Sequence, residues 1–187
     1  MLDSILLVLI LGCEIAFWVV LFLGMFARYV IGWPKFGLYC LYSIPLIDVL
    51  LFIVTVVDLR SGTTATFFHG LAAAYIGFSI IFGHGLIRWA DERFAHRFAN
   101  GPKPQAPPSV GWGNIKYELI LFAKALLACA ITFVLVRVMI WMVNDEDKIL
   151  SLYMWDNMVK VLAFFWLVFG PGYSLLFRLN KKEEDIK

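Results

Sequence analysis

Residues 66–89 of the chain read TFFHGLAAAYIGFSIIFGHGLIRW, with Arg88 as their only charged residue. A stretch of this kind is long enough for one helix to cross a bilayer, which takes about 20 residues. Four more stretches of similar length and apolarity occur, so the expected spans are 4–30, 36–57, 66–89, 118–143 and 155–177. They are continuously apolar rather than alternating. This favours helices over barrel strands, because every backbone group must be hydrogen-bonded within lipid.

The composition of the whole chain supports this interpretation. Its 187 residues are 61% hydrophobic and 16% charged, whereas soluble domains average about 45–50% apolar and about 25% charged residues. A chain this small cannot bury so much apolar surface in a water-soluble core. We therefore expect an all-α polytopic membrane protein, a bundle of five transmembrane helices in which residues 1–187 form a single integral membrane domain. An ordinary soluble enzyme, a disordered protein and a nucleic-acid-binding domain are excluded.

The basic residues favour one orientation of these spans. If the N-terminus lies outside, the cytoplasmic segments hold eleven Lys and Arg residues, whereas the outer segments hold only Arg60 and Lys148. Cytoplasmic loops of membrane proteins carry such an excess of basic residues, and this bias sets the orientation. The outer loop at 144–147 is acidic. We therefore expect the N-terminus outside and the C-terminus in the cytoplasm.

The longest connection, residues 90–117, is expected on the cytoplasmic side. Its first part has a helical pattern, because Phe94 and Phe98 lie four residues apart and polar residues flank them. We expect the third helix to extend into the cytoplasmic interface as far as Asn100 and Gly101, a pair that favours helix termination. The Pro-rich residues 101–108 then predict an extended linker, which serves as a spacer or as a docking site for a partner.

Small residues recur on one face of the third expected helix. Gly70, Ala73 and Gly77 follow the spacing of small residues that lets two helix backbones approach closely. His69 and His84 are fifteen residues apart, which places them about 60° apart around the helix and near the same face. We expect this helix to lie at the centre of the bundle and to contact several neighbours.

The most informative residues are ionisable side chains inside the spans, where a charge at the helix centre costs about 2.5–3.5 kcal/mol. Glu14 and Asp48 lie close to the middle of the bilayer, and Arg137 and Lys160 lie in its outer half. Charged residues inside a membrane usually face the bundle and pair with one another. We therefore expect an intramembrane polar cluster in which the two acids pair with Arg137 or Lys160, with His69 near its opening.

Each member of this cluster also has a purely structural interpretation. Basic side chains such as Arg137 and Lys160 can reach back to the membrane surface, and His69 and His84 can be hydrogen-bonded packing residues. A buried ion pair or a protonated acid fits the sequence as well as a transport role does. The two histidines are too far apart on one helix to hold a haem, and no cysteine has metal-site spacing. No cofactor and no metal are expected.

Two stretches of the chain carry a resemblance to a known family. Residues 56–60 read VVDLR, and residues 69–98 read HGLAAAYIGFSIIFGHGLIRWADERFAHRF. Over most of its length the chain resembles the YmcC-type proteins, a group of small membrane proteins of Gram-positive bacteria. The resemblance implies a bacterial plasma membrane and a bundle of five helices. It implies no activity and no catalytic residues.

Three functions from different classes remain open. The first is a small transporter or ion-coupled permease that uses Glu14 and Asp48, although five spans cannot form the even inverted repeat of many carriers unless a homodimer supplies a second half. The second is a structural or accessory protein that binds another membrane protein through the third helix and the Pro-rich loop. The third is a lipid-modifying enzyme that uses Asp91, Glu92 and His96. No catalytic sequence motif is present, so we favour a non-enzymatic protein.

Overall fold

The computed structural model describes residues 2–143 and 146–179. These residues form helices and no strand, which confirms the expectation of an all-α protein. Two of the elements, η1 and η3, are π-helical turns, and η2 is a short 3₁₀ helix. The elements in chain order are α1 (Leu2–Phe26), η1 (Ala27–Ile31), α2 (Pro34–Arg60), α3 (Phe67–Phe98), α4 (Gly111–Val143), η2 (Glu146–Lys148), α5 (Leu150–Leu167), η3 (Val168–Gly172) and α6 (Tyr173–Phe177).

In the described part of the chain, five helical segments are long and apolar enough to cross a membrane, the number expected from the sequence. They are Leu11–Ile31, Pro34–Arg60, Phe67–Phe98, Gly111–Val143 and Leu150–Phe177. The fourth segment begins at Gly111 and the fifth at Leu150, earlier than the expected 118 and 155. The fourth and fifth segments are therefore longer than the apolar stretches expected from the sequence, and the connection after α3 is shorter than expected.

Helix α3 runs without a break through residues 90–98 and ends at Phe98. Beyond it, Asn100 has a positive φ of 51°, and the N–H of Gly101 donates to the carbonyl of Ala95 at 2.9 Å. Asparagine tolerates this left-handed conformation better than most residues, so it can close a helix. The sequence Asn100-Gly101 thus terminates the helix in the way that its residue types predict.

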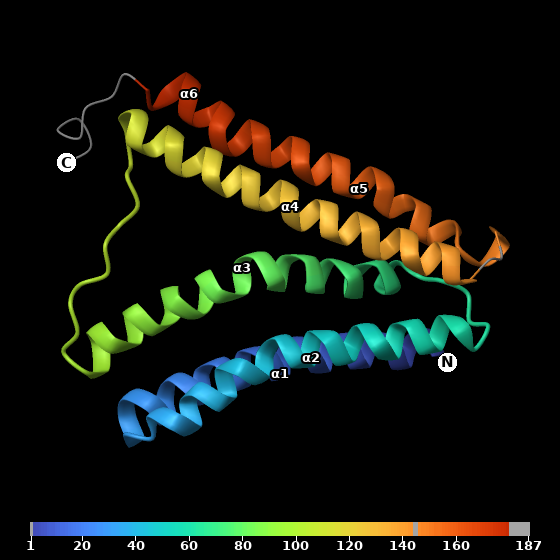
Figure 1. The fold of residues 1–187 in the computed structure, drawn as a ribbon, viewed down its shortest axis with the longest axis horizontal. Coiled ribbons are helices and arrows are strands. Elements are labelled where there is room, and N and C mark those ends of the chain that lie inside the picture. The colour runs from blue at the N-terminus through green and yellow to red at the C-terminus, as the bar shows by residue number, and fades with distance from the viewer. Residues whose placement is uncertain (1, 144–145, 180–187) are drawn as a thin grey trace.

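The long helices run up and down along one common direction, as Figure 1 shows. The start of α1 lies at the same end of the molecule as the α2–α3 and α4–α5 connections. The α1–α2 turn, the α3–α4 linker and α6 lie at the opposite end (Figure 1). If the five segments cross a bilayer, the two ends of the described chain therefore lie on opposite sides of it.

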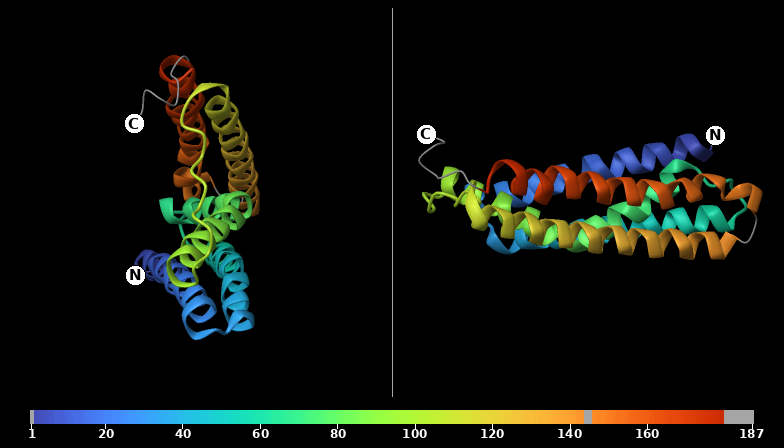
Figure 2. Two further views of the ribbon diagram at one scale, coloured as in Figure 1. Left: turned by 90° about the vertical axis from the view of Figure 1, so that its left-hand side faces the viewer. Right: turned by 90° about the horizontal axis from the view of Figure 1, so that it is seen from above.

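Helix α3 occupies the middle of the bundle. Figure 2 shows it between the α1–α2 pair and the α4–α5 pair, and it contacts all four of these helices. Ala73 is completely buried. A Cβ atom on Gly70 would overlap the indole ring of Trp155 in α5, and one on Gly77 would lie 2.5 Å from Oγ1 of Thr132 in α4. The face that carries Gly70, Ala73 and Gly77 therefore lies against α4 and α5.

Candidate intramembrane site

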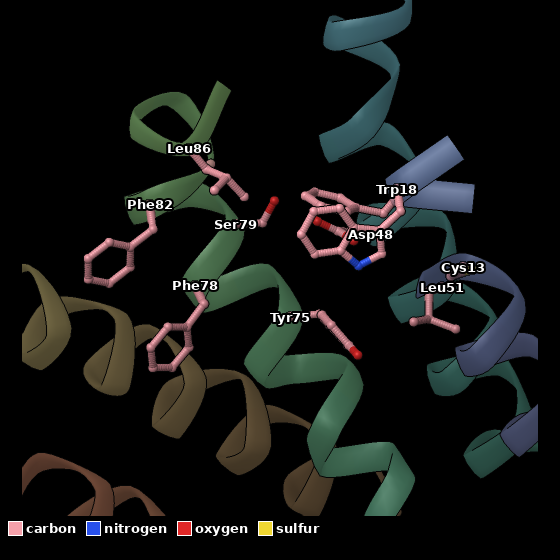
Figure 3. A pocket seen from close by; sticks show the side chains of 11 residues that line it. Cys13, Trp18, Asp48, Leu51, Tyr75, Phe78, Ser79, Phe82 and Leu86 are labelled. Atoms are coloured by element: carbon pink, nitrogen blue, oxygen red, sulfur yellow. The ribbon is translucent and has the colours of Figure 1, made fainter. Parts of the chain in front are cut away.

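A cavity of about 270 Å³ lies among α1, α2 and α3, and Figure 3 shows the side chains around it. Among the described residues that line it, Asp48 is the only charged one. The rest of the lining is mainly aromatic and aliphatic, with polar groups from Cys13, Tyr75 and Ser79. The described lining residues are Cys13, Phe17 and Trp18 from α1, Asp48 and Leu51 from α2, and Tyr75, Phe78, Ser79, Phe82, Gly83 and Leu86 from α3.

The position of Asp48 follows from the buried stripe of α2. The buried residues of this helix recur every three or four positions, which places them on one helix face. They are Gly37, Leu41, Ile44, Asp48, Leu51, Thr55 and Leu59. Asp48 falls in register with the apolar members and is only 8% exposed. Its carboxyl therefore faces the other helices rather than the surface of the bundle.

The depth of Asp48 is also set by α2. Residue 48 lies twelve positions before the end of the helix at Arg60, or about 18 Å along the axis at about 1.5 Å per residue. A bilayer core is about 30 Å thick, so a membrane spanned by α2 has Asp48 near its centre. The hydroxyl of Ser79 in α3 is presented to this carboxyl (Figure 3).

Arg137 does not pair with the acid in this cavity. Its Nη2 atom lies 2.5 Å from Oδ2 of Asp156 in α5, and its guanidinium group lies over the ring of Phe133. The sequence analysis did not single out Asp156, because the fifth span was expected to begin at residue 155. The helix begins at Leu150 instead, which places Asp156 more than one turn inside it, opposite Arg137.

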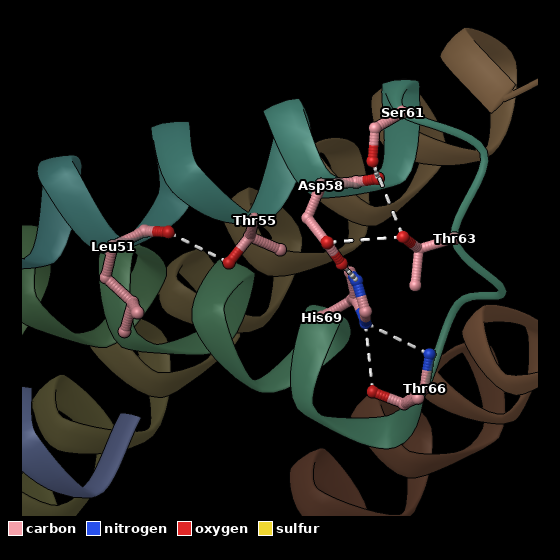
Figure 4. A network of polar contacts seen from close by, with 7 residues as sticks. All are labelled: Leu51, Thr55, Asp58, Ser61, Thr63, Thr66 and His69. Atoms are coloured by element: carbon pink, nitrogen blue, oxygen red, sulfur yellow. Dashed lines mark hydrogen bonds and ion pairs between the residues drawn. The ribbon is translucent and has the colours of Figure 1, made fainter. Parts of the chain in front are cut away.

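His69 also has a partner that the sequence analysis missed. Its ring is fully buried, and Nε2 lies 3.1 Å from Oδ2 of Asp58 at the end of α2. On the other side of the ring, the backbone N–H of Thr66 donates to Nδ1 at 3.0 Å (Figure 4). Because Nδ1 accepts this hydrogen bond, a neutral ring carries its proton on Nε2 and donates it to Asp58.

The Asp58–His69 contact forms part of a hydrogen-bonded network that joins α2 to α3. The hydroxyl of Thr63 donates to Oδ1 of Asp58 at 3.2 Å, and the hydroxyl of Ser61 donates to the Asp58 carbonyl at 2.7 Å (Figure 4). The Thr66 side chain and the His69 ring form a reciprocal cap on the first turn of α3. This supports the interpretation of His69 as a hydrogen-bonded packing residue.

The remaining members of the expected cluster lie elsewhere. His84 and Lys160 are exposed on α3 and α5, and neither of them lines the cavity. The side chain of Glu14 lies outside the described part of the structure. The structure therefore does not bring Asp48, His69 and Arg137 together into one cluster, because each of them has its own partners on a different helix.

The acidic residues near the end of α3 have structural partners. Asp91 accepts a hydrogen bond of 2.7 Å from the Tyr29 hydroxyl and lies 3.1 Å from the Arg28 guanidinium. Glu92 pairs with Arg88 one turn earlier in the same helix. His96 Nδ1 lies 3.0 Å from the Gly101 carbonyl. These contacts fix η1 and the end of α3, and they support a structural interpretation of this group rather than an enzymatic one.

Among the side chains that the structure describes, no group of three or more His, Cys, Asp or Glu residues is placed to hold a metal ion. The polar groups of the cavity are a carboxyl, two hydroxyls and a thiol in a mostly apolar lining. Such an arrangement can bind a proton or a single positive charge.

The five apolar helices and the composition define a multi-pass membrane protein. Over 141 residues, which are 75% of each chain, the sequence is 40% identical to the uncharacterized membrane protein YmcC of Bacillus subtilis (strain 168). The chain belongs to this YmcC family of bacterial membrane proteins, which confirms the resemblance carried by residues 56–60 and 69–98. No protein-family model matches the chain, and no solved structure matches it.

Proposed function

We propose that this protein is a small ion-coupled permease of the bacterial plasma membrane, in which the Asp48 carboxyl is the ion-binding group. The observation that carries the proposal is the placement of Asp48, which is 8% exposed, lies midway along α2 and faces a cavity. An ionisable group at such a depth is expensive and typically marks an ion or proton pathway. Glu14, one residue after the cavity residue Cys13, is the second proposed ion-binding acid.

The absence of a basic side chain from the described lining of the cavity favours this proposal over a buried ion pair. Arg137, which the sequence offered as a countercharge, pairs with Asp156, and Lys160 is exposed. A carboxyl without a fixed basic partner can exchange a proton or a cation at low electrostatic cost, whereas a paired carboxylate must first lose its partner. Asp48 therefore suits a binding role.

Flux measurements on the purified protein in liposomes test the proposal. We expect a proton flux under an imposed membrane potential, detected by a pH-sensitive dye inside the vesicles. Asp48→Asn should reduce it to the rate of protein-free liposomes, because the amide cannot bind a proton at the same site. Glu14→Gln should also reduce it. Asp147→Asn is the matched control, since the same chemical change at an exposed residue should leave the flux unchanged.

A flux that persists in Asp48→Asn, or wild-type protein that gives no flux, would contradict the proposed permease function.

The alternative function is that of an accessory protein that binds another membrane component, and one observation favours it. Helix α5 buries only Leu152 and Trp155 among its eighteen residues, so most of its apolar surface is free to contact lipid, a second copy of the chain or another membrane protein.

The proposed orientation, with the N-terminus outside and the C-terminus in the cytoplasm, can be tested with thiol reagents. It is supported by the excess of basic residues at the end of the bundle that holds the α3–α4 linker. Ser61 and Ser109 are exposed at opposite ends. In a background without native cysteines, Ser61→Cys should react with a membrane-impermeant reagent in intact cells, and Ser109→Cys should react only after lysis. The reverse pattern would show the opposite orientation.

A further inference from the structure

We propose that the cavity among α1, α2 and α3 binds a small aromatic or aliphatic organic cation, with its positive charge at Asp48 and its apolar body against the aromatic walls. The inference rests on the proposed permease function and names the substrate class of the same site.

The chemistry of the lining excludes other classes of ligand. Ca²⁺ takes about six to eight oxygen ligands, and Mg²⁺ keeps several of its waters. The described lining offers only Asp48 and the hydroxyls of Tyr75 and Ser79 as side-chain oxygens among apolar walls, which suits neither ion. An anion would be repelled by the carboxylate. A neutral apolar molecule would leave an ionised Asp48 buried without a countercharge, which is costly. A cation with an apolar body can pair with the carboxylate and pack against the apolar lining at the same time.

The aromatic side chains favour a cation over a neutral ligand in a second way. Five of the eleven lining residues are aromatic, namely Phe17, Trp18, Tyr75, Phe78 and Phe82. The faces of such rings attract positive charge, most strongly for Trp and away from water. Figure 3 shows Trp18 beside Asp48, whereas Phe78 and Phe82 point away from this carboxyl. Both of these rings stack on Trp166 of α5, with ring centroids 6.4 and 5.6 Å apart. Trp18 is therefore the ring best placed to meet a positive charge at Asp48, and Phe78 and Phe82 contribute apolar surface to the lining.

The size of the cavity and its surroundings limit the ligand further. Pockets for drug-sized molecules span about 300–1,000 Å³, so a cavity of about 270 Å³ suits a smaller cation. An apolar surface groove shares Trp18 with the cavity. It is lined by Trp18, Val19, Phe22, Leu23 and Phe26 of α1 and by Phe94 of α3. The shared Trp18 places this lipid-accessible groove next to the cavity.

Cys13 lines the cavity and provides a natural reporter of its occupancy. With Cys40 and Cys129 replaced by alanine, the rate at which N-ethylmaleimide alkylates Cys13 measures access to the site. The probe is benzyltrimethylammonium. Its control is neopentylbenzene, which has the same shape with a carbon in place of the charged nitrogen. We expect the cation to slow the alkylation at a concentration about tenfold lower than the neutral isostere, because only the cation is drawn to Asp48 and to the ring faces.

Asp48→Asn should abolish the difference between the two probes, and Trp18→Leu should weaken protection by the cation more than protection by the isostere. Equal protection by both probes in the protein that retains Asp48 would overturn the inference, as would no protection by the cation. This comparison requires no variant of Asp48, so it decides the question even if Asp48→Asn does not fold.

The outcomes also separate this inference from the proposed function. Protection by benzyltrimethylammonium without any flux in liposomes would overturn the permease and leave the cation site in place. Proton flux that depends on Asp48, together with no protection of Cys13 by the cation, would overturn the substrate class and leave the permease in place.

Discussion

Replacing Gly77 by leucine is expected to destabilise the bundle by about 3 kcal/mol, at the upper end of the usual cost of overpacking. A Cβ atom at this position would lie 2.5 Å from the Thr132 hydroxyl and 2.7 Å from the carbonyl oxygen of Ala128. The Thr132 hydroxyl is itself bonded to that carbonyl at 2.9 Å. Side-chain rotation cannot relieve a clash with backbone, so α3 and α4 must move apart.

The thermal midpoint in detergent measures this effect, and about 3 kcal/mol corresponds to about 6–12 °C for a chain of this length. Gly85→Leu is the matched control, because a Cβ atom on Gly85 of the same helix would meet nothing within 4 Å. It should leave the midpoint unchanged or raise it slightly, since leucine favours helix more than glycine does. If the two variants had the same midpoint, the close approach of α3 to α4 would be refuted.

The number of helices and the small-residue face of α3 could be predicted because both depend on local pattern. An apolar stretch of sufficient length indicates a span wherever it lies in the chain. The spacing of Gly70, Ala73 and Gly77 defines one helix face without knowledge of any neighbour. The residues at which α4 and α5 begin do not follow from the local apolar pattern. Both helices extend beyond their apolar stretches, through polar residues such as Asn114 and Ser151.

The partners of the buried charges could not be predicted in the same way. Depth alone placed Asp48 and Arg137 within reach of each other, but a pair also requires the two side chains to face each other, and helix rotation is set by tertiary packing.

The contact between Asp58 and His69, in contrast, had one indication in the sequence. The connection between α2 and α3 is short, with Arg60 as the last residue of α2 and Phe67 as the first of α3. Residues that flank such a turn lie close together, so Asp58 was a natural partner for His69.

The pairing of Arg137 with Asp156 gives the second large expected effect. The Asp156 side chain is only 15% exposed, and its Oδ1 atom is buried without a hydrogen-bond partner in the described structure. Arg137→Met should therefore leave a buried carboxylate without its countercharge. Removing one partner of a buried pair costs about 3–5 kcal/mol. We expect about 3 kcal/mol, the lower end of this range, because the Arg137 side chain is 47% exposed.

A double-mutant cycle shows whether this cost belongs to the pair. Asp156→Asn keeps the shape of the side chain and removes its charge, so combining it with Arg137→Met should restore part of the loss, with a coupling energy of about 1–3 kcal/mol. The matched cycle combines Arg137→Met with Asp48→Asn. It should be additive, because Asp48 faces the cavity among α1, α2 and α3 and Arg137 pairs with α5. Titration with a denaturing detergent gives the free energies of unfolding. Coupling of Arg137 to Asp48 rather than to Asp156 would show that the partner of the arginine is Asp48. Asp48 would then be one half of a structural ion pair instead of a binding group.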